Sequence, residues 1–150
     1  MSAGVEWLKV DAEHMLAVMA LPTLSFYEAW VKLMPSREGR LESIAAGVVS
    51  EFRTALLSNP ANHMDPDPMK IPLPCVRYAE SLVIAALCRE IDKPLSEAEQ
   101  RQVIRAEINL RYFYTGRLLV SGPEPGSGRP SYTVRRRRAG GRDVTEGGRA

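Results

Sequence analysis

A run of four arginines near the C-terminal end carries the most specific binding chemistry in this sequence. Arg135–Arg138 follow a short strand-like stretch, residues 131–134, and two glycines come shortly after them. Adjacent guanidinium groups bind phosphate or carboxylate oxygens through forked hydrogen bonds, and glycines let a segment adapt to its partner. The sequence therefore predicts a binding segment for a partner or DNA, formed by Tyr132, Val134, Arg135, Arg136, Arg137 and Arg138.

Two other interpretations of this segment remain open. The arginines could be a solvated tail. Alternatively, residues 131–134 could add as a strand to the sheet edge of another subunit, because backbone pairing does not require a core of its own.

The histidines and carboxylates give little support for catalysis. His14 and His63 are the only imidazoles, and neither belongs to a nucleophile or metal motif. His63, Asp65 and Asp67 could meet a hard cation, but the neighbouring prolines favour a rigid turn, and the spacing of a calcium loop is absent. The sequence also has no GxxxxGK[ST] loop, GxSxG elbow or HExxH pair. We therefore expect no enzyme activity, no cofactor and no bound metal.

Charge and cysteine usage narrow the class of protein further. Residues 121–150 hold seven arginines against three acids, a net charge of +4, whereas the whole chain carries +2. Cys75 and Cys88 lie in apolar stretches without CxxC spacing, which is typical of buried free thiols in a reducing cytosol. No apolar run approaches the roughly 20 residues that cross a bilayer, and the N-terminus does not resemble a secretion signal. We expect neither membrane insertion nor secretion.

The first third of the chain predicts a short extended segment and two helices. Residues 5–10 partly alternate apolar and polar side chains, as an extended segment does. Asp11 can cap a helix that ends near Leu21, one residue before a proline, because proline disfavours helical geometry in the residue preceding it. Ser25 can cap a second short helix that Pro35 stops.

A longer helix of about six turns is predicted next, with Ser36 as its cap. Its apolar residues follow the three-and-four spacing of one buried stripe: Leu41, Ile44, Ala45, Val48, Val49, Phe52, Ala55 and Leu56. Residues 58–74 contain five prolines, so they predict a long but stiffened loop. Pro74 suits the first turn of another amphipathic helix, which continues to about Ile91.

A last long helix begins at a capping box formed by Ser96 and Glu99. Gly116 is expected to end it, and residues 118–120 form a short apolar exit that either pairs as a strand or docks on a neighbour. The fold class is therefore mainly α, a small antiparallel bundle of about four main helices with a proline-rich loop.

The composition changes abruptly after Ser121, since seven of the eleven glycines fall in the last thirty residues. Such a segment has too little apolar surface to offset its ordering entropy alone. We expect a helical domain over residues 1–120 and an extended Gly/Arg-rich arm over residues 121–150 that is ordered only in an assembly.

The order of these features resembles the head-to-tail connector, or adaptor, proteins of long-tailed bacteriophages and prophages. The resemblance covers roughly residues 5–120 and is carried by Trp7-Leu8-x-Val10-Asp11-x-x-x-Met15-Leu16, Glu51-Phe52-Arg53, Asn59-Pro60-Ala61-Asn62, Ile71-Pro72-x-Pro74-Cys75-Val76-Arg77, Pro94-Leu95-Ser96-Glu97 and Gly116-Arg117. The arm after Ser121 departs from the family.

The resemblance implies a structural virion protein without catalytic residues. Such proteins commonly form a twelve-subunit ring under the portal protein, bind a downstream neck or tail-completion protein and surround the passing genomic DNA. The expected location is then the virion neck, with assembly in the host bacterial cytoplasm. A closed ring repeats one heterologous interface, so each protomer needs two different complementary surfaces. Candidate intersubunit residues lie in the proline-rich loop and the apolar exit: Asn59, Asn62, Asp65, Asp67, Leu118 and Leu119.

The alternative function is a nucleic-acid-binding regulator or a DNA-packaging accessory whose arginine run neutralises phosphates. Counterion release would then make its affinity for DNA fall steeply with salt.

Overall fold

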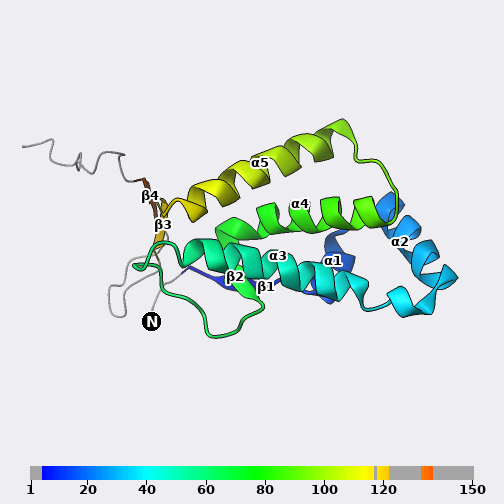
Figure 1. The fold of residues 1–150 in the computed structure, drawn as a ribbon, viewed down its shortest axis with the longest axis horizontal. Helices are drawn as coiled ribbons and strands as arrows, with labels where there is room; N and C mark the ends of the chain where they lie inside the picture. The colour runs from blue at the N-terminus through cyan, green and yellow to red at the C-terminus, as the bar shows by residue number, and fades with distance from the viewer. Residues whose placement is uncertain (1–4, 117, 122–132, 137–150) are drawn as a thin grey trace, which may run out of the picture.

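The computed structural model describes residues 5–116, 118–121 and 133–136, and this part of the chain is mainly helical (Figure 1). The elements follow in the order β1 (Trp7–Lys9), α1 (Ala12–Val18), α2 (Leu21–Leu33), a 3₁₀ turn (Pro35–Arg37), α3 (Arg40–Leu56), β2 (Lys70–Pro72), α4 (Leu73–Glu90), α5 (Glu97–Tyr114), β3 (Leu118–Ser121) and β4 (Thr133–Arg136). The prediction of a small, mainly α bundle is confirmed.

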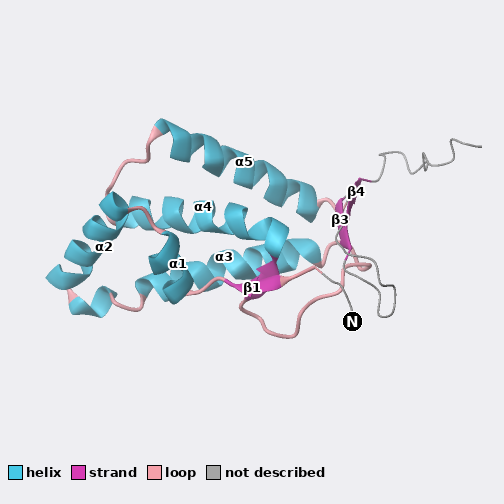
Figure 2. Cartoon of the chain, turned by 180° about the vertical axis from the view of Figure 1, so that it is seen from behind, coloured by secondary structure: helices cyan, strands magenta, loops and turns pink. Residues whose placement is uncertain are grey.

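Helices α3, α4 and α5 form the body of the bundle, and each runs antiparallel to the one before it (Figures 1 and 2). Helix α2 lies at one end of this body, and the β3–β4 pair lies at the other end. In the core, the rings of Phe52 and Phe113 meet edge to face at 6.5 Å, which joins α3 to α5.

Helix α3 buries all eight apolar residues of its predicted stripe, but it begins later than expected. Ser36 lies in the 3₁₀ turn, and Gly39 is the N-cap of α3. Pro35 opens that turn, and Arg37 holds it by donating to the Trp30 carbonyl at 3.1 Å and covering the Trp30 ring. The serine therefore belongs to a separate turn that precedes the helix.

The boundary between α1 and α2 also differs from the prediction. Asp11 caps α1 as expected, its side chain accepting from the His14 amide at 2.9 Å. However, α1 ends at Val18, α2 starts at Leu21, and Ser25 lies inside α2. The backbone amides in the first turn of a helix have no partner within the helix, so a proline, which has no amide hydrogen, is tolerated there. The proline after Leu21 therefore starts α2 instead of ending α1.

The extended N-terminal segment pairs with a strand that the proline pattern concealed. β1 and β2 are antiparallel, with Trp7 opposite Pro72 and Lys9 opposite Lys70. Backbone bonds from the Val10 amide to the Met69 carbonyl and from the Leu73 amide to the Glu6 carbonyl flank the pair. The expected first-turn proline of α4 and the end of α4 beside Ile91 are both confirmed.

The capping box of α5 is formed as predicted, since the Ser96 and Glu99 side chains each accept from the other residue's backbone amide. Gly116 follows the helix with a positive φ of 68°. The apolar exit is strand β3, and its partner is β4 of the same chain, with Leu119 opposite Arg135. Thr133 and Val134 of the strand-like stretch thus pair within the chain, and residues 131–132 lie outside the described residues.

Candidate functional site

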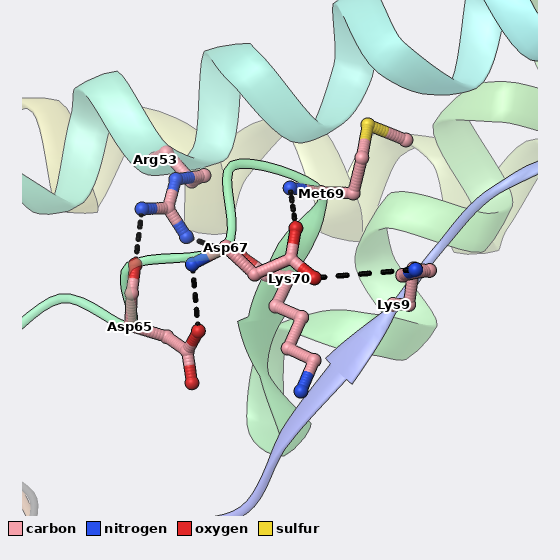
Figure 3. Close-up of polar contacts among 6 residues, drawn as sticks. All are labelled: Lys9, Arg53, Asp65, Asp67, Met69 and Lys70. Carbon is pink, nitrogen blue, oxygen red and sulfur yellow. Dashed lines mark hydrogen bonds and ion pairs between the residues drawn. The ribbon is translucent and has the colours of Figure 1, made fainter.

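The proline-rich loop is fastened to the bundle by Arg53 of α3 (Figure 3). The guanidinium donates to the backbone carbonyls of Asp65 and Lys70, both at 2.6 Å, and lies 5.6 Å from the centre of the Trp7 ring. One side chain thus joins α3, the loop, β2 and β1. Arginine suits this role because its rigid fork presents several donors in one plane.

The two aspartates predicted as intersubunit residues shape this same loop (Figure 3). Asp65 accepts from the Asp67 amide at 2.8 Å, and Asp67 accepts from the Met69 amide at 2.9 Å. These are Asx turns, which fix the backbone two residues further on. The second Asp67 oxygen lies 4.0 Å from the Lys9 ammonium, so the loop is also tied to β1.

The two predicted asparagines of the loop bond inside the protomer as well. Asn62 donates to the Leu56 carbonyl at 2.8 Å, while Asn59 accepts from the Ala61 amide at 3.0 Å. The Asn59 amide group also lies 3.4 Å from the Gly116 carbonyl, between the ends of α3 and α5. These four polar side chains therefore fix the shape of the loop, and any partner would meet a preformed surface there.

Among the described residues, no three His, Cys, Asp or Glu side chains lie close enough together to hold a metal ion. His14 instead bonds to Glu80 at 2.7 Å and thereby links α1 to α4. Cys75 and Cys88 are buried free thiols, as predicted. Burial raises the pKa of Cys75 to about 12 and also raises that of Cys88.

The predicted binding residues of the arm are only partly described. Val134, Arg135 and Arg136 lie in β4, opposite Val120, Leu119 and Leu118 of β3. The backbone pairing thus brings Leu118 and Leu119, predicted as intersubunit residues, beside two arginines of the run. Tyr132, Arg137 and Arg138 lie outside the described residues.

Large apolar side chains remain exposed at the α2 end of the bundle. We call this set the α2 apolar end: Leu21, Phe26, Leu33 and Met34. Leu33 is 82% exposed and Leu21 is 75% exposed. Single exposed apolar residues are ordinary, but several on one short element indicate a contact surface.

A second exposed apolar feature lies on the outer face of α5. Ile104 and Ile108 are 57% and 45% exposed, although Ala106 and Leu110 on the other face of the helix are buried. We call these two isoleucines the α5 ridge. Their spacing of four residues puts them one above the other on the helix surface. The sequence shows both isoleucines beside the buried stripe, but only the packing of α5 reveals that they face away from the core.

A shallow groove of about 420 Å³ lies between α3 and α4 and escaped the sequence analysis. Its lining combines apolar and charged side chains. The lining residues are Arg40, Ser43, Ile44, Gly47, Val48, Glu51, Ala86, Arg89 and Glu90. The one signal in the sequence was Gly47, because glycine inside a helix costs about 1 kcal/mol relative to alanine and usually has a packing reason.

The charges at one end of this groove are held in place by an ion pair. Arg40 Nε donates to both carboxylate oxygens of Glu90, at 2.9 and 2.7 Å. These hydrogen bonds hold the pKa of Glu90 below its usual range and raise that of Arg40. At neutral pH, this end of the groove therefore carries a fixed pair of charges next to Arg89.

The wider comparisons add no relative to this description. Among the described residues, no helix combines the length and apolar character needed to cross a membrane. No known family model, curated protein or solved structure matches this chain.

Proposed function

We propose that this protein is a structural subunit of a phage head-to-tail connector, forming a ring under the portal that joins the capsid to the tail and surrounds the DNA channel. In this proposal it acts in the neck of the virion after assembly in the bacterial cytoplasm. Its partners are further copies of itself in a ring, twelve by the resemblance, together with the portal protein and a downstream neck protein. Residues 1–120 serve as the ring body, and the arm serves as an attachment segment.

The observation that carries the proposal is the distribution of exposed apolar surface. The α2 apolar end lies at one end of the bundle, and the α5 ridge lies along its side. A ring subunit in a neck needs lateral surfaces for its two neighbours and end surfaces for the partners above and below it. Apolar residues at both kinds of place fit that requirement better than they fit a monomer.

The anchored loop and the arm support the same proposal. Arg53 and the two aspartates give the loop one defined shape, so a contact made through it loses little conformational entropy. The β3–β4 pair leaves the bundle at the end opposite α2 and carries the start of the arginine run. The two ends of the protomer therefore differ in chemistry, as two different axial partners require.

To test the proposal, the purified protein is mixed with portal-bearing heads that lack their connector, and the product is imaged by electron microscopy. We expect ring-shaped density at the portal vertex with the full chain, and lost or weakened density with a chain lacking residues 121–150. The matched control is a full chain in which only Asp143 and Glu146, the last two acids of the arm, are replaced by Asn and Gln.

Two results would contradict the proposal in part or in whole. Normal attachment of the truncated chain would contradict the attachment role given to the arm. No density at the portal, together with DNA binding that falls at least about tenfold between 50 and 200 mM salt, would favour the nucleic-acid-binding regulator or packaging accessory.

A further inference from the structure

We propose that α5 of one copy lies in the α3–α4 groove of a second copy, parallel to the α3 of that copy, with the α5 ridge over Gly47. This inference rests on the proposed ring and names the two surfaces that would form its lateral contact. Both surfaces belong to every protomer, and they differ from each other, so the contact is heterologous.

Gly47 leaves room in the groove for an added helix. It is an exposed residue of the lining, and a Cβ built there would meet no atom within 4 Å. The backbone of a second helix can therefore approach α3 closely at this position. Ile44, one turn before the glycine in α3, and Val48, directly after it, supply apolar atoms in the lining.

The α5 ridge has the matching pattern. Helices that bind grooves present apolar anchors three or four residues apart, as Ile104 and Ile108 are. The opposite face of α5 packs on its own α3 and α4 through Ala106, Leu110 and Phe113, and no α5 residue lines the groove. The ridge and the groove can therefore be used at the same time without unfolding the protomer.

Charge complementarity selects the second copy as the occupant and fixes its direction. If Ile104 lies over Gly47 in the parallel direction, Glu97 lies two helical turns before it, level with Arg40 and close to Arg89. Glu97 is 87% exposed and pairs with Arg101 at 3.7 Å only at the surface, so its carboxylate can turn toward Arg40 and Arg89, which outnumber Glu90 at this end of the groove.

The other end of the groove is complementary in the same register. Ile108 lies level with Glu51, and the two arginines within one turn of that isoleucine, Arg105 and Arg111, flank the carboxylate. The antiparallel direction instead sets Glu97 near Glu51 and the arginines near Arg40 and Arg89. The arginines would then face the end where Arg40 and Arg89 outnumber Glu90, and Glu97 would face Glu51, which opposes that orientation.

The experiment uses two variants of the full chain, each of which destroys one surface. Gly47→Arg fills the groove, and the free space around Gly47 lets the protomer keep its fold. The double variant Ile104→Glu/Ile108→Glu removes the ridge at positions exposed to solvent. The matched control is Leu21→Glu/Leu33→Glu, which makes the same change at the α2 apolar end. Circular dichroism establishes that each variant is folded.

Sedimentation velocity then measures the assembly of each chain. We expect the wild type and the α2 control to self-associate, and each single-surface variant to remain a monomer. An equimolar mixture of the two variants retains one intact ridge and one intact groove. It should therefore form one-to-one dimers and nothing larger.

Several results would overturn this pairing. One is a wild type that stays monomeric up to about 1 mM, a concentration at which an interface of only about 4 kcal/mol would be half formed. The others are a variant mixture that forms assemblies larger than dimers and a variant mixture that forms no dimers. Loss of assembly in the α2 control would also overturn it, because a different surface would then be responsible.

Failure of the proposed function has a different signature. If the variant mixture dimerises but the wild type shows no density on portal-bearing heads, the pairing stands and the connector function falls. If both single-surface variants are monomers in solution but still give ring-shaped density at the portal, the pairing falls and the connector function stands.

Discussion

At the scale of single residues, Gly116 is a position where only glycine fits. Its φ of 68° is in the left-handed region, and a Cβ there would lie 2.9 Å from the Ser58 carbonyl oxygen. We expect Gly116→Ala to lower the free energy of unfolding by about 1–2 kcal/mol, since both the strained backbone and the contact disfavour a side chain. Urea denaturation measures the change.

The matched control is Gly47→Ala. Gly47 lies inside α3 with open space around it, so an alanine there should raise the free energy of unfolding by up to about 1 kcal/mol. Equal effects of the two substitutions would contradict this account of Gly116.

Cys75 makes the stability sensitive to alkaline pH. Burial raises the pKa of its thiol from 9.0 to about 12, so above pH 9 the unfolded chain loses this proton while the folded chain keeps it. The contribution of this thiol to the free energy of unfolding is fully present below pH 9. It is lost as the pH rises toward 12, by at most about 1.4 kcal/mol per pH unit. Urea denaturation at pH 8 and pH 10 should therefore show a smaller loss for Cys75→Ala than for the wild type. An identical loss in both chains would refute the assignment.

At the scale of elements, Arg53 determines whether the proline-rich loop stays closed. The variant Arg53→Lys keeps the charge but loses the planar fork that serves two carbonyl groups at once. We expect the free energy of unfolding to fall by about 1–3 kcal/mol and the loop at residues 57–69 to become sensitive to a nonspecific protease.

The exposed variant Arg101→Lys serves as the comparison, because Arg101 makes only a surface pair with Glu97 at 3.7 Å. A loop that resists the protease equally in both variants would show that β1–β2 pairing alone closes it.

The elements also show how far sequence reasoning reaches. The buried stripe of α3 and the capping box of α5 were predictable because they are local patterns, read within one or two turns. The starts of α2 and α3 were not, since a proline suits both the end of one helix and the first turn of the next. β2 was missed because its partner, β1, lies far away in the sequence.

The same distinction applies to the candidate surfaces. The polar loop residues stood out by type, but their hydrogen bonds depend on Arg53 and on the chain ends that surround them. The α5 ridge and the groove depend on which face of each helix is covered, and that is settled by packing between elements. Of the groove residues, only Gly47 could have been noticed in the sequence, as a glycine inside a helical pattern.

At the scale of the whole molecule, the hydrophobic core is formed by the helical domain. Within residues 5–116, where the structure describes burial, the buried core residues lie between Val10 and Phe113. A chain that ends at Ser121 should therefore keep its helical circular dichroism, and its melting temperature should fall by no more than about 4–8 °C, the shift expected for about 1 kcal/mol in a small domain. A larger fall would show that the β3–β4 pair stabilises the bundle.

The β1–β2 pair also determines the order in which the chain can fold. Trp7 and Pro72 bracket α1, α2, α3 and the whole proline-rich loop, so during synthesis β1 has no strand to pair with until β2 has been made. Pairings between such distant residues carry a large loop-closure entropy and form late. β1 is thus made well before it can dock, and the N-terminal segment can close onto the molecule only after α1, α2, α3 and β2 have been made.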